Sequence, residues 1–136
     1  MGHAEILSCS DSRVPPELVF DQGLGDLFII RVAGNVATDV EIGSLEYGAE
    51  HLHIPLLVVL GHQSCGAVTA AVQGGPPEGH IATLINLIKP AVEKSNGMGF
   101  HKGRASISSP ARRLVSSWLL MPTEGSMTQA VSQWVE

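Results

Sequence analysis

The chain has few cysteines, few aromatic side chains and few charges for its 136 residues. Two cysteines are too few for a disulfide-built scaffold, although one bridge is possible. A net charge of −5 argues against a nucleic-acid partner, since such binders are usually basic. No apolar run approaches the roughly 20 residues of a membrane span, and no signal peptide is visible. The composition, 44% hydrophobic, therefore predicts one globular domain without a nucleic-acid or membrane partner, located in the cytoplasm.

Apolar runs alternate with helical patterns along the first 95 residues. Strands are expected at 4–8, 26–32 and 54–62 because these stretches are continuously apolar or rich in β-branched residues. Helices are expected at 15–20, 38–52, 64–75 and 80–95, the last interrupted or kinked at Pro90. This alternation predicts an α/β fold with a mainly parallel central sheet flanked by helices.

Both cysteines lie directly after predicted strands. Cys9 and Asp11 follow the first strand, His62 ends the third, and Cys65 begins the next helix. Loops at the carboxyl ends of parallel strands share one edge of the sheet. Two sulfurs, an imidazole and a carboxylate at one point form a tetrahedral zinc set, and a helix N-terminus favours the Cys65 thiolate.

Simpler interpretations exist for each of these residues. A single cysteine is usually a small buried apolar side chain, and a single histidine is more often structural than a ligand. Cys9 and Cys65 could also form a disulfide, which a reducing cytosol would disfavour. The joint pattern favours metal binding, because all four residues fall at strand ends that are predicted independently.

Several spaced motifs resemble the β-class carbonic anhydrases. They are "CSDSR" followed by "HQSC", together with "VFDQGLGDLFIIRVAGN", "GSLEYGAEHL" and "GHIATLINLIKPAVE", covering about residues 5–94. The resemblance implies one Zn²⁺ per chain, with Cys9, His62 and Cys65 as ligands and Asp11 as the fourth ligand or the partner of Arg13. It implies an enzyme, a lyase that reversibly hydrates carbon dioxide to bicarbonate and a proton. It also implies a homodimer or higher homo-oligomer.

Asp11 and Arg13 suggest a switch at such a zinc site. With Asp11 bound, the metal has no position for water; paired with the planar guanidinium of Arg13, Asp11 would leave that position open. Both residues are therefore predicted to be catalytic, and activity is expected to rise at alkaline pH. No substrate-binding residue is assigned.

The two ends of the chain depart from the family pattern. An N-terminal helical arm, a glutamine before the first strand and the usual C-terminal edge strand are not recognisable, which leaves a periplasmic origin as an alternative. Residues 1–95 are expected to form the zinc-binding catalytic core, and residues 96–136 a divergent tail of the same domain, helical at 111–121 and 127–135 or poorly ordered. The alternative functions are a carbon disulfide or carbonyl sulfide hydrolase of this fold, and a shortened zinc-binding protein without turnover.

Overall fold

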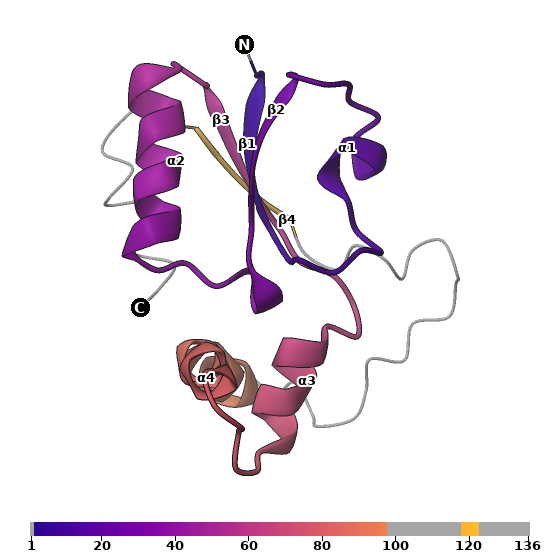
Figure 1. The fold of residues 1–136 in the computed structure, drawn as a ribbon, viewed down its shortest axis with the longest axis vertical. Coiled ribbons are helices and arrows are strands. Elements are labelled where there is room, and N and C mark those ends of the chain that lie inside the picture. Colours follow the sequence, from indigo (N-terminus) through magenta and orange to yellow (C-terminus); the bar gives the residue numbers. More distant parts are fainter. Residues whose placement is uncertain (1, 98–117, 123–136) are drawn as a thin grey trace.

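A central sheet organises the computed structural model, which describes residues 2–97 and 118–122 (Figure 1). Its strands are β1 (Ala4–Ser8), β2 (Leu27–Arg31), β3 (Leu56–Leu60) and β4 (Trp118–Pro122). They lie in the order β2-β1-β3-β4. The first three strands run parallel, and β4 pairs antiparallel with β3. The prediction of an α/β fold with a mainly parallel sheet is confirmed.

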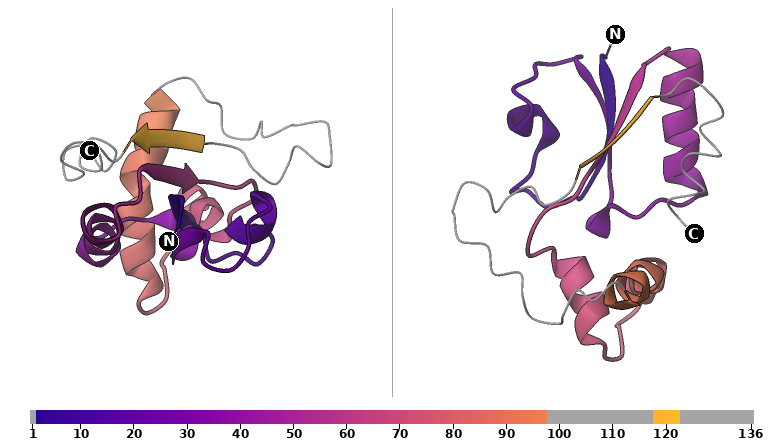
Figure 2. Two further views of the ribbon diagram at one scale, coloured as in Figure 1. Left: turned by 90° about the horizontal axis from the view of Figure 1, so that it is seen from above. Right: turned by 180° about the vertical axis from the view of Figure 1, so that it is seen from behind.

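Helices surround this sheet on three sides. They are α1 (Pro16–Val19), the short 3₁₀ turn η1 (Ala33–Asn35), α2 (Asp39–His51), α3 (Gly66–Gln73) and α4 (Ile81–Gly97). Figure 1 shows α2 along one face of the sheet and α1 on the other. The views in Figure 2 show α3 and α4 side by side beyond the carboxyl ends of the parallel strands. None of these described helices has the length and apolarity needed to cross a bilayer.

Local sequence signals account for the helix ends. Thr38 and Glu41 form the capping box that begins α2, and the Thr38 backbone N–H donates to the Glu41 carboxylate at 2.9 Å. Gly74 ends α3 with a positive φ of 69°, which glycine adopts without strain. α4 continues through Pro90, so of the interruption or kink expected there the interruption does not occur.

Among the residues that the structure describes, three apolar clusters hold these layers together. Leu7 and Leu45 belong to the cluster between the sheet and α2, and Ile6 and Leu60 to the one facing α1. The third cluster joins η1, α3 and α4, and consists of the buried side chains of Val36, Ala71, Ile85 and Ile88. Burial of aliphatic side chains stabilises by about 1.5–3 kcal/mol each. The third cluster therefore packs α3 against α4 and against the segment around η1 that follows β2.

β4 corrects the expectation for the tail. Residues 118–122 form a strand, whereas a helix was expected over 111–121, and the β4 backbone pairs Trp118 with Leu60 and Pro122 with Leu56. Without β4, the outer edge of β3 would carry a row of unpaired backbone N–H and C=O groups. The need for this pairing arises from the tertiary structure and cannot be seen in the local sequence pattern, which favours a helix. A C-terminal edge strand that was not recognisable in the sequence is therefore present as β4. The helix expected at 127–135 lies outside the described residues.

Candidate metal centre

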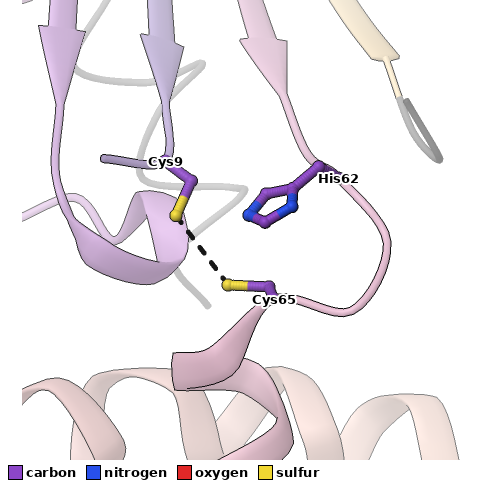
Figure 3. A group of neighbouring side chains, drawn as sticks. All are labelled: Cys9, His62 and Cys65. Atoms are coloured by element: carbon purple, nitrogen blue, oxygen red, sulfur yellow. Dashed lines mark hydrogen bonds between the residues drawn. The ribbon is translucent and has the colours of Figure 1, made fainter. Parts of the chain in front are cut away.

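Three metal-binding side chains converge at the carboxyl ends of β1 and β3. Figure 3 shows Cys9, His62 and Cys65 pointing toward one another. Their donor atoms all lie within 4.8 Å of one another, and all three residues are buried. Because β1 and β3 are parallel neighbours, with Ser8 beside Leu60, the residues that follow the two strands reach the same edge.

The segment between His62 and Cys65 turns sharply to bring the second cysteine back. Ser64 has a φ of 54°, in the left-handed region that non-glycine residues rarely adopt. Cys65 then occupies the N-cap position of α3, as the sequence predicted. Backbone outliers of this kind concentrate at functional sites.

The geometry of the three donors fits a zinc ion. The two Sγ atoms are 3.8 Å apart and both cysteines are free, so the alternative disulfide is not formed. Two zinc–sulfur bonds of about 2.3 Å at a tetrahedral angle would separate their sulfurs by about 3.8 Å. The Nε2 atom of His62 is buried without a hydrogen-bond partner, which is costly unless something binds it.

The surroundings of the two thiols act in opposite directions on how easily a thiol loses its proton. Burial raises the pKa of the Cys65 thiol, whereas hydrogen bonds from the Val68 and Ala67 amides of α3 act to lower it. The helix terminus therefore favours the thiolate, as expected, but burial and the neighbouring Cys9 outweigh it and leave the pKa of Cys65 raised. The Gly34 N–H donates to the Cys9 Sγ at 3.4 Å. A bound cation would supply the charge compensation that two buried thiolates need.

Asp11 lies beside this cluster but faces Arg13. The Arg13 Nε and Nη2 donate to the two carboxylate oxygens of Asp11 at 2.9 and 2.7 Å, and the Arg13 backbone N–H donates to Oδ1 at 2.9 Å. The hydrogen-bonded guanidinium holds the pKa of Asp11 well below its usual range. The Asp11 Oδ2 remains 3.9 Å from the His62 Nε2. Of the two roles left open for Asp11, the structure shows the pairing with Arg13.

Sequence reasoning missed two contributors to this site. Arg31, the last residue of β2, donates to the backbone carbonyls of Cys9 and Asp11. A charged residue ending an otherwise apolar strand was the available signal. Gly34 was also missed, and it lies where a Cβ would come within 2.7 Å of the Ile88 Cδ1. That close approach depends on how α4 packs, which no local pattern reports.

An open depression lies beside the donor cluster. It has a volume of about 450 Å³ and is lined by His62, Ser64, Cys65, Val68, Thr69, Val72 and Gln73. Two donor residues therefore lie in its wall. The valines at positions 68 and 72 are one helical turn apart on α3 and present an apolar surface beside the site.

A mainly parallel sheet flanked by helices carries two cysteines and a histidine, all buried, at its strand ends. This combination places the chain in a class of α/β proteins that are built to bind a metal ion. A sequence model described as "Carbonic anhydrase" matches residues 4–119. Carbonic anhydrase 2 of Mycobacterium tuberculosis is 47% identical over 93 residues, which cover 65% of this chain and 45% of that protein.

Solved structures agree with this match. The β-carbonic anhydrase of Coccomyxa in complex with acetazolamide is 28% identical, with a TM-score of 0.69, and the similarity covers 75% of this chain and 48% of that one. A tetrameric β-carbonic anhydrase of Sordaria macrospora has the same fold, at 24% identity and a TM-score of 0.67, over 76% of this chain and 55% of that one.

The chain belongs to the carbonic anhydrase family, in its β class. The family match extends beyond residues 5–94, because it includes the first residues of β4. The chain spans about half the length of the relatives that it matches.

Proposed function

We propose that this protein is a zinc-dependent carbonic anhydrase that reversibly hydrates carbon dioxide to bicarbonate and a proton. The observation that carries the proposal is the Cys9, His62 and Cys65 cluster beside an Asp11 carboxylate that is held by Arg13. The three donors would hold one Zn²⁺ per chain. When bound, zinc acts as a Lewis acid that activates water as a nucleophile near neutral pH.

In this proposal Asp11 and Arg13 are the catalytic pair. Arg13 keeps the Asp11 carboxylate ionised and paired with the guanidinium, so the three donors alone would hold the zinc and water could reach it. At 3.9 Å from the His62 Nε2, an Asp11 oxygen is close enough to accept a hydrogen bond from a nucleophile in that position and to orient it. Arg13 also donates to the Ser64 carbonyl at 3.1 Å, which ties the two ligand loops together.

Carbon dioxide is the substrate that the observations favour. The open depression offers apolar valine side chains beside the donors, suited to a small uncharged molecule. The relatives named above are carbonic anhydrases, which supports carbon dioxide over carbon disulfide or carbonyl sulfide. No residue is assigned to bind the substrate by a hydrogen bond.

Metal analysis and stopped-flow hydration of carbon dioxide on the same preparation test the proposal. About one zinc per chain, with hydration abolished in Cys65→Ser, is the expected result. Stoichiometric zinc without hydration would instead identify a zinc-binding protein without turnover. Hydrolysis of carbon disulfide or carbonyl sulfide without hydration of carbon dioxide would identify the related hydrolase.

Self-association is a second part of the proposal. Val40 and Tyr47 on α2 are 74% and 52% exposed, and Ile81 on α4 is 53% exposed. Exposed apolar surface of this kind favours a homodimer or a higher homo-oligomer. Light scattering should show more than one chain per particle, and a monomer at high concentration would refute this.

The compartment and the domain organisation complete the proposal. We propose a cytoplasmic location, since two free buried thiols suit a reducing compartment; cell fractionation tests it. We also propose that residues 1–95 form the catalytic core and residues 96–136 a tail of the same domain. The pairing of β4 with β3 supports a single domain, and limited proteolysis tests it.

A further inference from the structure

Arg31 joins the two parts of the chain that carry the first metal donor and the carboxylate. Its Nε donates to the Cys9 carbonyl at 2.8 Å, and its Nη2 donates to the Asp11 carbonyl at 2.6 Å. The neighbouring Val32 N–H donates to the Ser8 carbonyl at 3.0 Å, which fixes the base of the Arg31 side chain beside β1. A single planar guanidinium thus holds the backbone on both sides of Ser10.

Residue 11 is consequently held from two directions. Arg31 binds its main-chain carbonyl, and Arg13 binds its side-chain carboxylate. The Asp11 carbonyl also accepts the Val14 N–H at 3.2 Å. The direction of a short side chain such as aspartate is set largely by its backbone, because only two torsions lie between them. A shift of the Asp11 carbonyl would therefore carry the carboxylate with it.

We propose that Arg31 is a positioning residue for the hydration reaction: by holding the carbonyls of Cys9 and Asp11, it keeps the Asp11 carboxylate on Arg13 and off the metal. This inference rests on the proposed function. Arginine suits the role because its Nε and Nη donors lie along one edge of a rigid plane and can bind two acceptors at once. A lysine ammonium is a point charge without that fixed fork, so it cannot hold both carbonyls in the same geometry.

A purely structural role makes a different prediction. If Arg31 only stabilises the fold, its replacement should lower both the stability and the metal content of the protein. These losses should be the same whichever residue occupies position 11. If it positions Asp11, the effect should depend on the Asp11 carboxylate and should leave the three metal donors intact.

The primary test is amide exchange at Arg13 in zinc-loaded protein, measured by NMR. The Arg13 N–H donates to the Asp11 Oδ1, so it reports directly whether the carboxylate stays in place. Arg31→Lys should accelerate this exchange by about 10-fold, since a misplaced carboxylate no longer protects it. Amides at the centre of β3, such as Val59, should not change. Ile30→Val is the matched control: it removes a methyl group from a buried neighbour on β2 without touching the loop.

The second test uses cobalt in place of zinc, because its visible spectrum responds to the fourth ligand. Arg31→Lys should keep about one metal per chain and shift the spectrum in the same direction as Arg13→Ala. In an Asp11→Asn background the same change should leave the spectrum unaltered. A shift that persists there, loss of more than half the metal, or unchanged exchange at Arg13 would overturn the proposal.

Activity provides a third measurement that separates this inference from the proposed function. If the protein hydrates carbon dioxide, Arg31→Lys should lower kcat about 10-fold while KM changes less, because a misplaced group costs turnover more than binding. If the wild type does not hydrate carbon dioxide, the proposed function fails, and the exchange and cobalt results still decide whether Arg31 positions Asp11.

Discussion

Glu5 is a carboxylic acid in the apolar core, and its removal should make the protein more stable above neutral pH. It lies on β1, is 0% exposed, and neither carboxyl oxygen has a hydrogen-bond partner. Gly48 of α2 lies against it, because a Cβ at position 48 would collide with the Glu5 Oε1. Phe28 is its register partner on β2. Burial raises the pKa of Glu5 to about 7 from an ordinary value of 4.5.

The magnitude follows from the two pKa values. Between about pH 4.5 and 7 the folded protein keeps a proton that the unfolded chain releases, so stability falls as pH rises through that window and then levels off. At 1.36 kcal/mol for each pKa unit, the loss reaches about 3 kcal/mol above neutral pH and is about 1 kcal/mol at about pH 5.5. Glu5→Gln keeps the shape of the side chain but cannot ionise.

Urea unfolding of wild type and Glu5→Gln, at equal protein and zinc concentrations from about pH 5.5 to 8.5, measures this difference. The variant should gain about 2 kcal/mol relative to wild type across that range. Comparison at each pH cancels the titration of the metal donors, which both proteins share. Glu50→Gln, which changes an exposed carboxylate on α2, is the control and should shift stability by a small constant amount. A Glu5→Gln difference that does not change with pH would refute the reasoning.

Three other changes probe the metal centre. Cys65→Ser should lose zinc and unfold at a lower temperature, because metal binding is coupled to folding. Metal analysis and thermal unfolding measure these two effects, and full retention of zinc would contradict the prediction. Arg13→Ala should keep zinc but lower the turnover of carbon dioxide hydration about 10-fold or more, because Asp11 is released toward the metal. If the variant keeps wild-type activity near neutral pH, Arg13 is only a charged residue of the loop without a role in catalysis. Gly34→Ala should destabilise the protein by about 1–3 kcal/mol, because residue 34 has a φ of 72°. Its new Cβ would also meet Ile88, so adding Ile88→Val should recover part of the loss in urea unfolding; no recovery would place the whole cost in the backbone.

The sequence alone was enough to predict the parallel α/β core. Continuous apolar strands and the alternating helical patterns are local features. So are the residues at the helix ends, such as Thr38 at the start of α2 and Gly74 at the end of α3, because each depends on its neighbours along the chain. The donors at positions 9, 62 and 65 were also predictable, since parallel neighbours must deliver the residues that follow them to one edge. The resemblance of the motifs to one family then predicted which family the chain belongs to, and the match over residues 4–119 confirms that family.

Tertiary packing decided what those local signals could not. β4 forms where a helix was expected, because the open edge of β3 needs a partner strand. Asp11 lies on Arg13 because a bidentate guanidinium is within reach, whereas spacing along the chain allowed either the metal or the arginine. Burial raises the pKa of Cys65 against the effect of the helix terminus. The contacts of Arg31 and Gly34 depend on segments 20–54 residues away along the chain. Composition and periodicity depend only on residues that are near one another along the chain. Desolvation and long-range contacts arise only when the helices and strands pack together, so the sequence pattern does not reveal them.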